Sequence, residues 1–414
     1  MFSSSLLKYN YIRKKYFLGQ NYDISSFELF ELILTKKINK PRFNFFEFLI
    51  NLISLILSTI TILKCKLFNL NKINYYIVFK NDLSDPRSNN INSIFKSDKN
   101  INIIKTSGLG LSLLAYFKIK NVILHESIVY FSRFFFTEKK FTLKEKFKNI
   151  HRCKKRQNLI YFKIFKFLKI RKLLMIDDYR EIQNFINICK KLNIETIGYM
   201  HSRFSKYRVS LRYDCFDKFI VWTKFFKKKL IEINPKYKNK ILINNFRNFK
   251  RISSNQVSGQ TTVLFFSDTM MDYKSVINYL NQLKRKNIKV LVRLKSNQNE
   301  NKYFLSYLKE NNFINANEAN IEAIVKKYKP KFFMATNSNV LLEATLYNCF
   351  PIILKTKNDY SFDLIKDNVA ICYSGKSNFH KFLKNLENKK NLLNDIYNKI
   401  WNSKYETKHI KGLF

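Results

Sequence analysis

The polar loop at residues 336–339 has the residue types best suited to chemistry in this chain. Four side chains stand there in a row: Thr336, Asn337, Ser338 and Asn339. An apolar run at 331–335 precedes them, and apolar residues at helical spacing follow. In such a strand–loop–helix unit, hydroxyls, amides and backbone N–H groups at the helix start can hold a phosphate. Glu343 follows one turn later, within reach of a sugar hydroxyl of a bound nucleotide. An ordinary capped helix with a surface glutamate produces the same pattern.

Two cations stand near the end of a second predicted strand. Arg293 and Lys295 occupy alternate positions, so we expect both side chains to point to one face. Together with the 336–339 loop and with Ser267, which follows a predicted strand at 262–266, they can clamp a diphosphate without a metal ion. Two cations among 76 basic residues are also expected by chance.

The best candidate for a general base is His201, which directly follows a predicted strand at 196–200. The unperturbed pKa of histidine lies near physiological pH, so this residue can accept a proton from a hydroxyl group. A surface or hydrogen-bonded loop histidine is an equal alternative. Asp178 is a second candidate for the base. Three more residues near strand ends are expected to contact the acceptor: His125, Glu126 and Arg203.

These residues can form a common site only if the strands that precede them end at the same edge of a sheet. Short apolar runs alternate with amphipathic helical segments from residue 73 onward, which predicts parallel sheets with right-handed crossovers. A polar segment at 251–260 separates two such series. We therefore expect an α/β chain with two tandem Rossmann-like domains that face a cleft. The predicted parts are a membrane-associating segment at 1–70, an acceptor domain at 71–255, a nucleotide-donor domain at 256–390, and a C-terminal helix and tail at 391–414.

The segment 48–63 contains no charged residue and is flanked by lysines and arginines. Its 16 residues fall just short of the length that a membrane span needs. A buried helix, a helix in the membrane interface and a true span are all compatible with it. Basic residues at both ends favour an interfacial helix. We expect a cytoplasmic protein that is peripheral to, or weakly inserted in, the inner membrane.

Composition limits the remaining classes of function. The formal charge is +46, but the lysines are spread evenly over the chain, which does not favour a specific nucleic-acid surface. The six cysteines show no metal-type spacing and indicate free thiols in a reducing compartment. No cluster of histidine and carboxylate residues has metal spacing, and there is no phosphate-binding P-loop. We expect neither a metal nor a resident cofactor.

Three segments together carry a family resemblance. They are GYMHSR…DKFIVWTKFFKKKLIEINPKYKNKILINNF at 198–246, RLK at 293–295 and TNSNVLLEATLYNCFPIIL at 336–354. This order resembles bacterial surface-polysaccharide transferases of the glycosyltransferase-B fold, including capsule and glycerol-phosphate polymer transferases. Ser338 and Glu343 match the group. His201 matches the histidine of its Gln-His-Gly motif, although the neighbours differ, and Lys295 stands where the group often carries a second histidine.

The resemblance implies a metal-independent glycosyltransferase that moves a sugar from a nucleotide-activated donor to a cell-surface polysaccharide or a lipid-linked glycan. Transfer of glycerol phosphate from a CDP-activated donor is one alternative. A catalytically silent binding subunit is another, because the second histidine is missing.

Overall fold

The computed structural model describes two compact α/β units, whose main border lies between residues 247 and 248. The described residues are 44–67, 75–81, 99–105, 109–133, 143–176, 182–201, 203–204, 211, 216–244, 249–252, 261–267, 272–284, 288–295, 302–317, 320–336, 338–356, 362–375 and 377–402. Residues 1–43 of the predicted membrane-associating segment, Asp178, Asn337 and most of the 251–260 boundary lie outside them.

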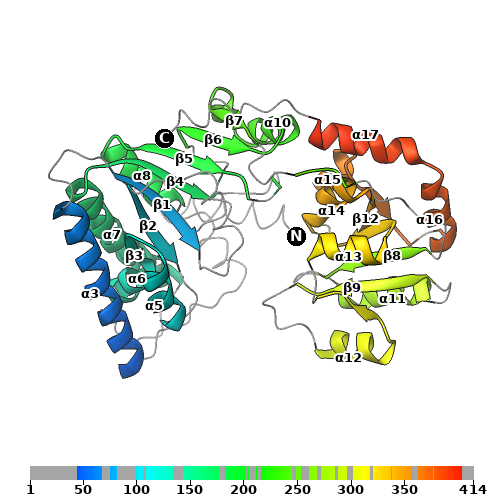
Figure 1. The fold of residues 1–414 in the computed structure, drawn as a ribbon, viewed down its shortest axis with the longest axis horizontal. Helices are drawn as coiled ribbons and strands as arrows, with labels where there is room; N and C mark the ends of the chain where they lie inside the picture. Colours follow the sequence, from blue (N-terminus) through cyan, green and yellow to red (C-terminus); the bar gives the residue numbers. More distant parts are fainter. Residues whose placement is uncertain are drawn as a thin grey trace. The chain divides into compact units, whose positions relative to one another are not determined.

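The first unit is built on a seven-stranded parallel sheet (Figure 1). Its strands are β1 (Tyr75–Asn81), β2 (Asn100–Lys105), β3 (Val122–Leu124), β4 (Ile170–Ile176), β5 (Glu195–Tyr199), β6 (Lys218–Val221) and β7 (Ile241–Ile243). Its helices are α3 (Phe45–Leu67), α5 (Leu109–Lys118), α6 (His125–Arg133), α7 (Leu143–Phe167), α8 (Ile182–Lys191) and α10 (Lys224–Ile233), with a 3₁₀ turn η2 (Pro235–Tyr237). The strand order β3-β2-β1-β4-β5-β6-β7 is that of a doubly wound fold, with its reversal between β1 and β4.

The second unit holds a six-stranded parallel sheet of the same topology, in the order β10-β9-β8-β11-β12-β13. Its strands are β8 (Thr262–Phe266), β9 (Lys289–Arg293), β10 (Ile314–Asn315), β11 (Phe332–Ala335), β12 (Phe350–Leu354) and β13 (Ile371–Tyr373). Its helices are α11 (Tyr273–Lys284), α12 (Lys302–Glu310), α13 (Ile321–Tyr328), α14 (Val340–Glu343), α15 (Phe362–Lys366), α16 (Phe379–Glu387) and α17 (Lys390–Trp401), with a 3₁₀ turn η3 (Ala344–Tyr347). Here the order reverses between β8 and β11.

Continuous apolar runs explain the central strands, because a parallel sheet with helices on its faces buries both sides of each strand. Every residue of β8 and of β12 is buried. Asparagine takes the left-handed backbone positions after several elements, for example Asn193, Asn312 and Asn348. Glycine usually fills such positions, and this chain has only seven glycines, so asparagine, which tolerates that conformation, replaces it.

The structure confirms the predicted fold class: two Rossmann-like parallel sheets and an N-terminal apolar helix. The predicted strand at 262–266 has the observed bounds. The loops expected at 107–110 and 125–126 overlap the first two residues of α5 and of α6, and the two-residue strand β10 was not expected. A short strand at the end of a sheet has too few residues to show a period, which explains why β10 leaves no sequence signal.

Helix α17 packs on the second unit. The indole Nε1 of Trp401 donates hydrogen bonds to the carbonyl oxygen of Leu342 at 3.2 Å and to Oγ1 of Thr345 at 3.1 Å. The ring also contacts Phe249, with centroids 4.8 Å apart. Through these contacts α17 supports the segment α14–η3.

Candidate functional site

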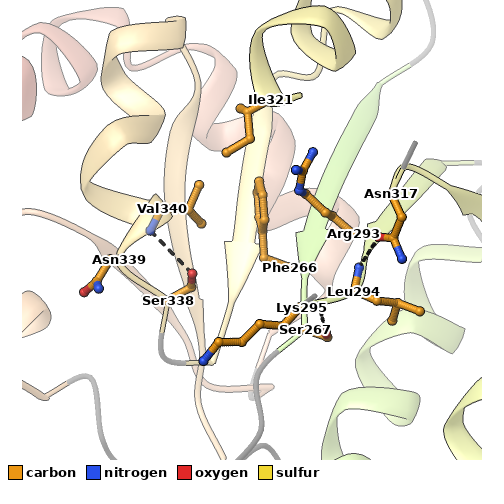
Figure 2. Close-up of a pocket in the computed structure, with 10 residues that line it drawn as sticks. All are labelled: Phe266, Ser267, Arg293, Leu294, Lys295, Asn317, Ile321, Ser338, Asn339 and Val340. Atoms are coloured by element: carbon orange, nitrogen blue, oxygen red, sulfur yellow. Dashed lines mark hydrogen bonds between the residues drawn. The ribbon is translucent and has the colours of Figure 1, made fainter. Parts of the chain in front are cut away.

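A pocket of about 360 Å³ lies at the carboxyl edge of the second sheet (Figure 2). Its walls come from the ends of β8, β9 and β10 and from the starts of α13 and α14. The lining residues are Phe266, Ser267, Arg293, Leu294, Lys295, Asn317, Ile321, Ser338, Asn339 and Val340. The pocket therefore includes the point between β8 and β11 where the strand order reverses, which is where open α/β sheets bind ligands.

Three hydrogen bonds fix the strand ends that form the pocket. The backbone N–H of Ser267 donates to the carbonyl oxygen of Arg293 at 3.0 Å. The N–H of Lys295 donates to Oγ of Ser267 at 3.0 Å, and the N–H of Leu294 donates to Oδ1 of Asn317 at 2.6 Å (Figure 2). These bonds hold the loops after β8, β9 and β10 together.

Both predicted cations line this pocket. The guanidinium of Arg293 is half-buried, and this burial lowers its pKa from the usual value. Lys295 is exposed, and its side chain extends toward the loop that carries Ser338 (Figure 2). Strand β9 ends at Arg293, so Lys295 lies two residues beyond the strand, and both residues contribute to the lining of the same pocket.

The loop before α14 is less suited to bind an anion than we expected for the start of a helix. Helix α14 has four residues before it tightens into η3, and Asn339 makes no side-chain capping bond. Oγ of Ser338 accepts a long hydrogen bond from the N–H of Val340, at 3.4 Å. The N–H groups of Leu341 and Leu342 already donate to carbonyl oxygens one turn back. The charge for holding an anion therefore comes mainly from the Arg293 and Lys295 side chains.

The other predicted donor residues have different surroundings. Thr336 is buried at the end of β11, and Glu343 is half-buried at the end of α14. Neither lines the pocket, whereas Ser267, Ser338 and Asn339 do. Asn337 lies outside the described residues.

The residues assigned to the acceptor lie in the first unit. His201 is half-buried and follows Met200, whose N–H donates to the carbonyl oxygen of Ile220 at 2.9 Å. Arg203 is also half-buried, two residues later. His201 thus stands just past the carboxyl end of β5, as expected for a residue that faces a ligand at that edge.

His125 and Glu126 do not form the expected loop after β3. They are the first two residues of α6, and His125 is 1% exposed. Nδ1 of His125 lies 2.7 Å from the hydroxyl of Tyr161, and the two rings are stacked. This burial among aromatic rings favours a structural role for His125, while Glu126 remains half-buried.

Two polar residues that lie at or near the carboxyl ends of strands were not identified from the sequence. Asn317 lines the pocket after β10, and its only sequence signal is an asparagine-rich stretch. Lys80 lies near the carboxyl end of β1, beside the point where the first strand order reverses. It is 5% exposed, and burial lowers its pKa to about 8. The sequence signal for Lys80 is a lysine that directly follows an apolar strand segment.

Comparison with solved structures adds a fold assignment. The calicheamicin glycosyltransferase CalG4 matches 82% of this chain and 97% of its own, with a TM-score of 0.51 at 9% identity. The chain has the glycosyltransferase-B fold. The UDP-GlcNAc 2-epimerase of Neisseria meningitidis, solved with UDP-GlcNAc bound, matches 82% of this chain and 98% of its own, with a TM-score of 0.50 at 10% identity. No protein-family model matches the sequence, and a search of curated proteins finds no match.

At this identity the likeness shows the fold alone, and the chemistry must come from the residues. A glycosyltransferase-B fold with two cations and two serines at the reversal point of one sheet can hold a diphosphate. Among the described residues no group of three histidine, cysteine or carboxylate side chains is arranged to bind a metal ion.

Proposed function

We propose that this protein is a glycosyltransferase that moves a sugar from a nucleotide-activated donor to a cell-surface polysaccharide or a lipid-linked glycan, without a metal ion. The observation that carries the proposal is the pocket at the β8/β11 reversal, with Arg293, Lys295, Ser267 and Ser338 in its wall. The epimerase of the same fold, which binds UDP-GlcNAc, supports a nucleotide-sugar ligand.

In the proposed reaction an acceptor hydroxyl oxygen forms a bond to the anomeric carbon of the donor sugar. The bond between that carbon and the diphosphate oxygen breaks, and the electron pair leaves with the diphosphate. His201 accepts the hydroxyl proton. Arg293 and Lys295 stabilise the negative charge that develops on the departing diphosphate. A half-buried arginine suits this role, because a charge pair gains strength where water is partly excluded.

A thermal-shift screen with UDP, GDP, CDP, CMP and their sugar conjugates tests the donor site. A ligand that binds only the folded protein stabilises it by about 2.7 kcal/mol at a hundred times its dissociation constant, so we expect a clear rise in melting temperature with one nucleoside diphosphate. The Arg293→Gln variant should lose most of this rise. Arg171→Gln, at an exposed site in the first unit, is the matched control.

The same screen, combined with an assay of sugar transfer and donor hydrolysis, separates the alternatives. A response to CDP and CMP conjugates alone would favour transfer of glycerol phosphate or a similar unit. Nucleotide binding without any transfer or hydrolysis would favour a silent binding subunit. No response to any nucleotide, or an equal response in the Arg293→Gln variant, would overturn the assignment of this pocket.

A further inference from the structure

Helix α3 has its polarity reversed relative to an ordinary surface helix. Its buried residues are small or polar: Asn51, Ser54, Ser58, Thr61 and Cys65. Eight of its large apolar side chains are exposed, with exposed fractions between 40% and 69%, while its other large apolar side chains are half-buried. The eight exposed residues are Phe45, Phe46, Leu49, Ile53, Ile56, Ile60, Leu63 and Leu67. A soluble helix normally places its apolar stripe toward the core, so this exposed stripe needs another apolar surrounding.

The exposed side chains form one continuous stripe. From Phe46 to Leu67 they recur at intervals of three and four residues, which keeps them on one side of the α-helix, and Phe45 directly precedes the series. We call these eight residues the outer stripe. Helix α5, which lies beside α3 in Figure 1, adds two exposed apolar side chains, Leu114 and Phe117, the latter 78% exposed.

The opposite side of α3 is fixed to the first unit along most of the helix. Oγ of Ser58 accepts a hydrogen bond from the N–H of Leu124 in the edge strand β3, at 3.0 Å. Near its end, the hydroxyl of Tyr75 donates to the carbonyl oxygen of Cys65 at 2.6 Å. Nζ of Lys66 donates to the carbonyl oxygen of Phe167 at 3.2 Å.

These contacts decide between two membrane arrangements. By length and composition α3 can cross a bilayer. A crossing would carry β3 and the hydrogen-bonded face of α3 into hydrocarbon, where the polar groups of the surrounding α/β unit would lose their water. A helix that lies flat places only its outer stripe in lipid and leaves the packed face unchanged.

The charges around the stripe fit an anionic surface. Lys64 is exposed on α3 itself. Helix α5 and the turn after it contribute exposed Lys118 and Lys120, with no acidic residue between 109 and 121. Helix α7, which ends beside Lys66, contains many basic residues and a single acidic one, Glu145. Basic side chains that flank an apolar helix face are typical of helices that bind anionic lipid.

We infer that α3 binds an anionic phospholipid bilayer as an in-plane helix, with its outer stripe in the acyl region and the neighbouring lysines at the headgroups. This inference depends only on the first unit and stands apart from the nucleotide pocket. A second copy of the chain is the competing occupant of the same apolar surface.

Vesicle flotation with the full chain tests the binding. We expect flotation with phosphatidylglycerol/phosphatidylethanolamine vesicles and less with pure phosphatidylcholine. A wash at about 0.5 M salt screens the general attraction of a highly basic protein, while apolar insertion persists. The double variant Ile56→Gln/Ile60→Gln should partition at least about tenfold more weakly after this wash, because two apolar side chains leave the lipid. Leu305→Gln, on α12 of the second unit, is the matched control, and thermal unfolding checks that each variant is folded.

Tryptophan depth measurements test the orientation. Leu49→Trp, Ile56→Trp and Leu63→Trp place a reporter along the outer stripe, and the native Trp222 and Trp401 are buried. Quenching by lipids brominated at different carbons should give the same depth at all three positions. In a spanning helix, positions 49 and 63 would lie about 21 Å apart along the membrane normal, on either side of position 56.

Three results would overturn the inference. The first is absence of flotation with any vesicle. The second is equal flotation, after the salt wash, of the wild type and the Ile56→Gln/Ile60→Gln variant. The third is a depth gradient from position 49 to position 63. Dimerisation that the double variant abolishes, in a protein that does not float, would assign the stripe to a second copy instead.

Discussion

The N–H of Lys295 donates a hydrogen bond to Oγ of Ser267 at 3.0 Å, which joins the end of β9 to the end of β8 in the wall of the pocket. Ser267 is 5% exposed, so this hydroxyl exchanges little with water. The bond places the first residues beyond β9, and with them the Lys295 side chain, beside the β8/β11 reversal. Ser267 is therefore a positioning residue as well as a lining residue.

Replacing Ser267 with alanine should loosen the loop after β9. We expect the free energy of unfolding to fall by about 1 kcal/mol, because a partly buried N–H loses its acceptor. The melting-temperature rise with the bound nucleotide should also shrink, since Lys295 is held less well. Ser377→Ala, at an exposed position of the same unit, controls for the loss of a hydroxyl. Unchanged nucleotide binding in the Ser267→Ala variant would remove Ser267 from the site.

The Trp401→Phe variant tests how α17 supports the pocket segment. Phenylalanine keeps an aromatic ring against Phe249 but removes the donor to Leu342 and Thr345. Both acceptors are buried, so we expect a loss of about 1–3 kcal/mol in urea unfolding. Tyr303→Phe, which changes a largely exposed ring on α12, should have little effect. Equal stability of the two variants would show that the indole hydrogen bonds contribute nothing.

Lys80 should give the first unit a specific pH dependence. Its pKa is lowered from 10.5 to about 8, so between these values the unfolded chain binds more protons at this residue than the folded one. The contribution of Lys80 to stability therefore rises with pH across this window. Lys80→Met should stabilise the protein at pH 7 by up to about 3 kcal/mol, and this gain should decline between pH 8 and 10.5.

Chemical denaturation of the wild type and Lys80→Met over pH 7–10.5 provides the measurement. Lys238→Met, at an exposed lysine of the same unit, corrects for the loss of one surface charge. A difference between wild type and Lys80→Met that stays constant with pH would contradict a lowered pKa at Lys80.

His201→Ala separates binding from turnover. The variant should fold and bind nucleotide like the wild type, because His201 lies in the first unit and the pocket in the second. Turnover should fall by about 10²–10⁴-fold if His201 is the general base. His380→Ala, which replaces an exposed histidine on α16, should retain full activity. Unchanged turnover in His201→Ala would exclude His201 from the mechanism.

The alternation of buried strands and amphipathic helices could be predicted from the sequence, because apolar residues recur at spacings that differ between strands and helices. The strand at 262–266 was predicted with the observed bounds. Residues next to such strands, including Ser267 and Arg293, were found for the same reason, since parallel strands end at one edge. The short pieces β10 and α14 carry too few residues to show a period, so Asn317 was not anticipated, and Asn339 makes no side-chain capping bond at the start of α14.

The sequence by itself determined which residues stand at strand ends and that residues 48–63 form an apolar helix. Only the tertiary structure decided how these side chains are used. It buried His125 against Tyr161, gathered Ser267, Arg293, Lys295 and Ser338 around one pocket, and turned the polar side of α3 inward. The physical reason is that the local period of a sequence shows only that a helix or strand has two different sides. Which side packs on the core depends on contacts between residues far apart in the chain, such as Ser58 with Leu124.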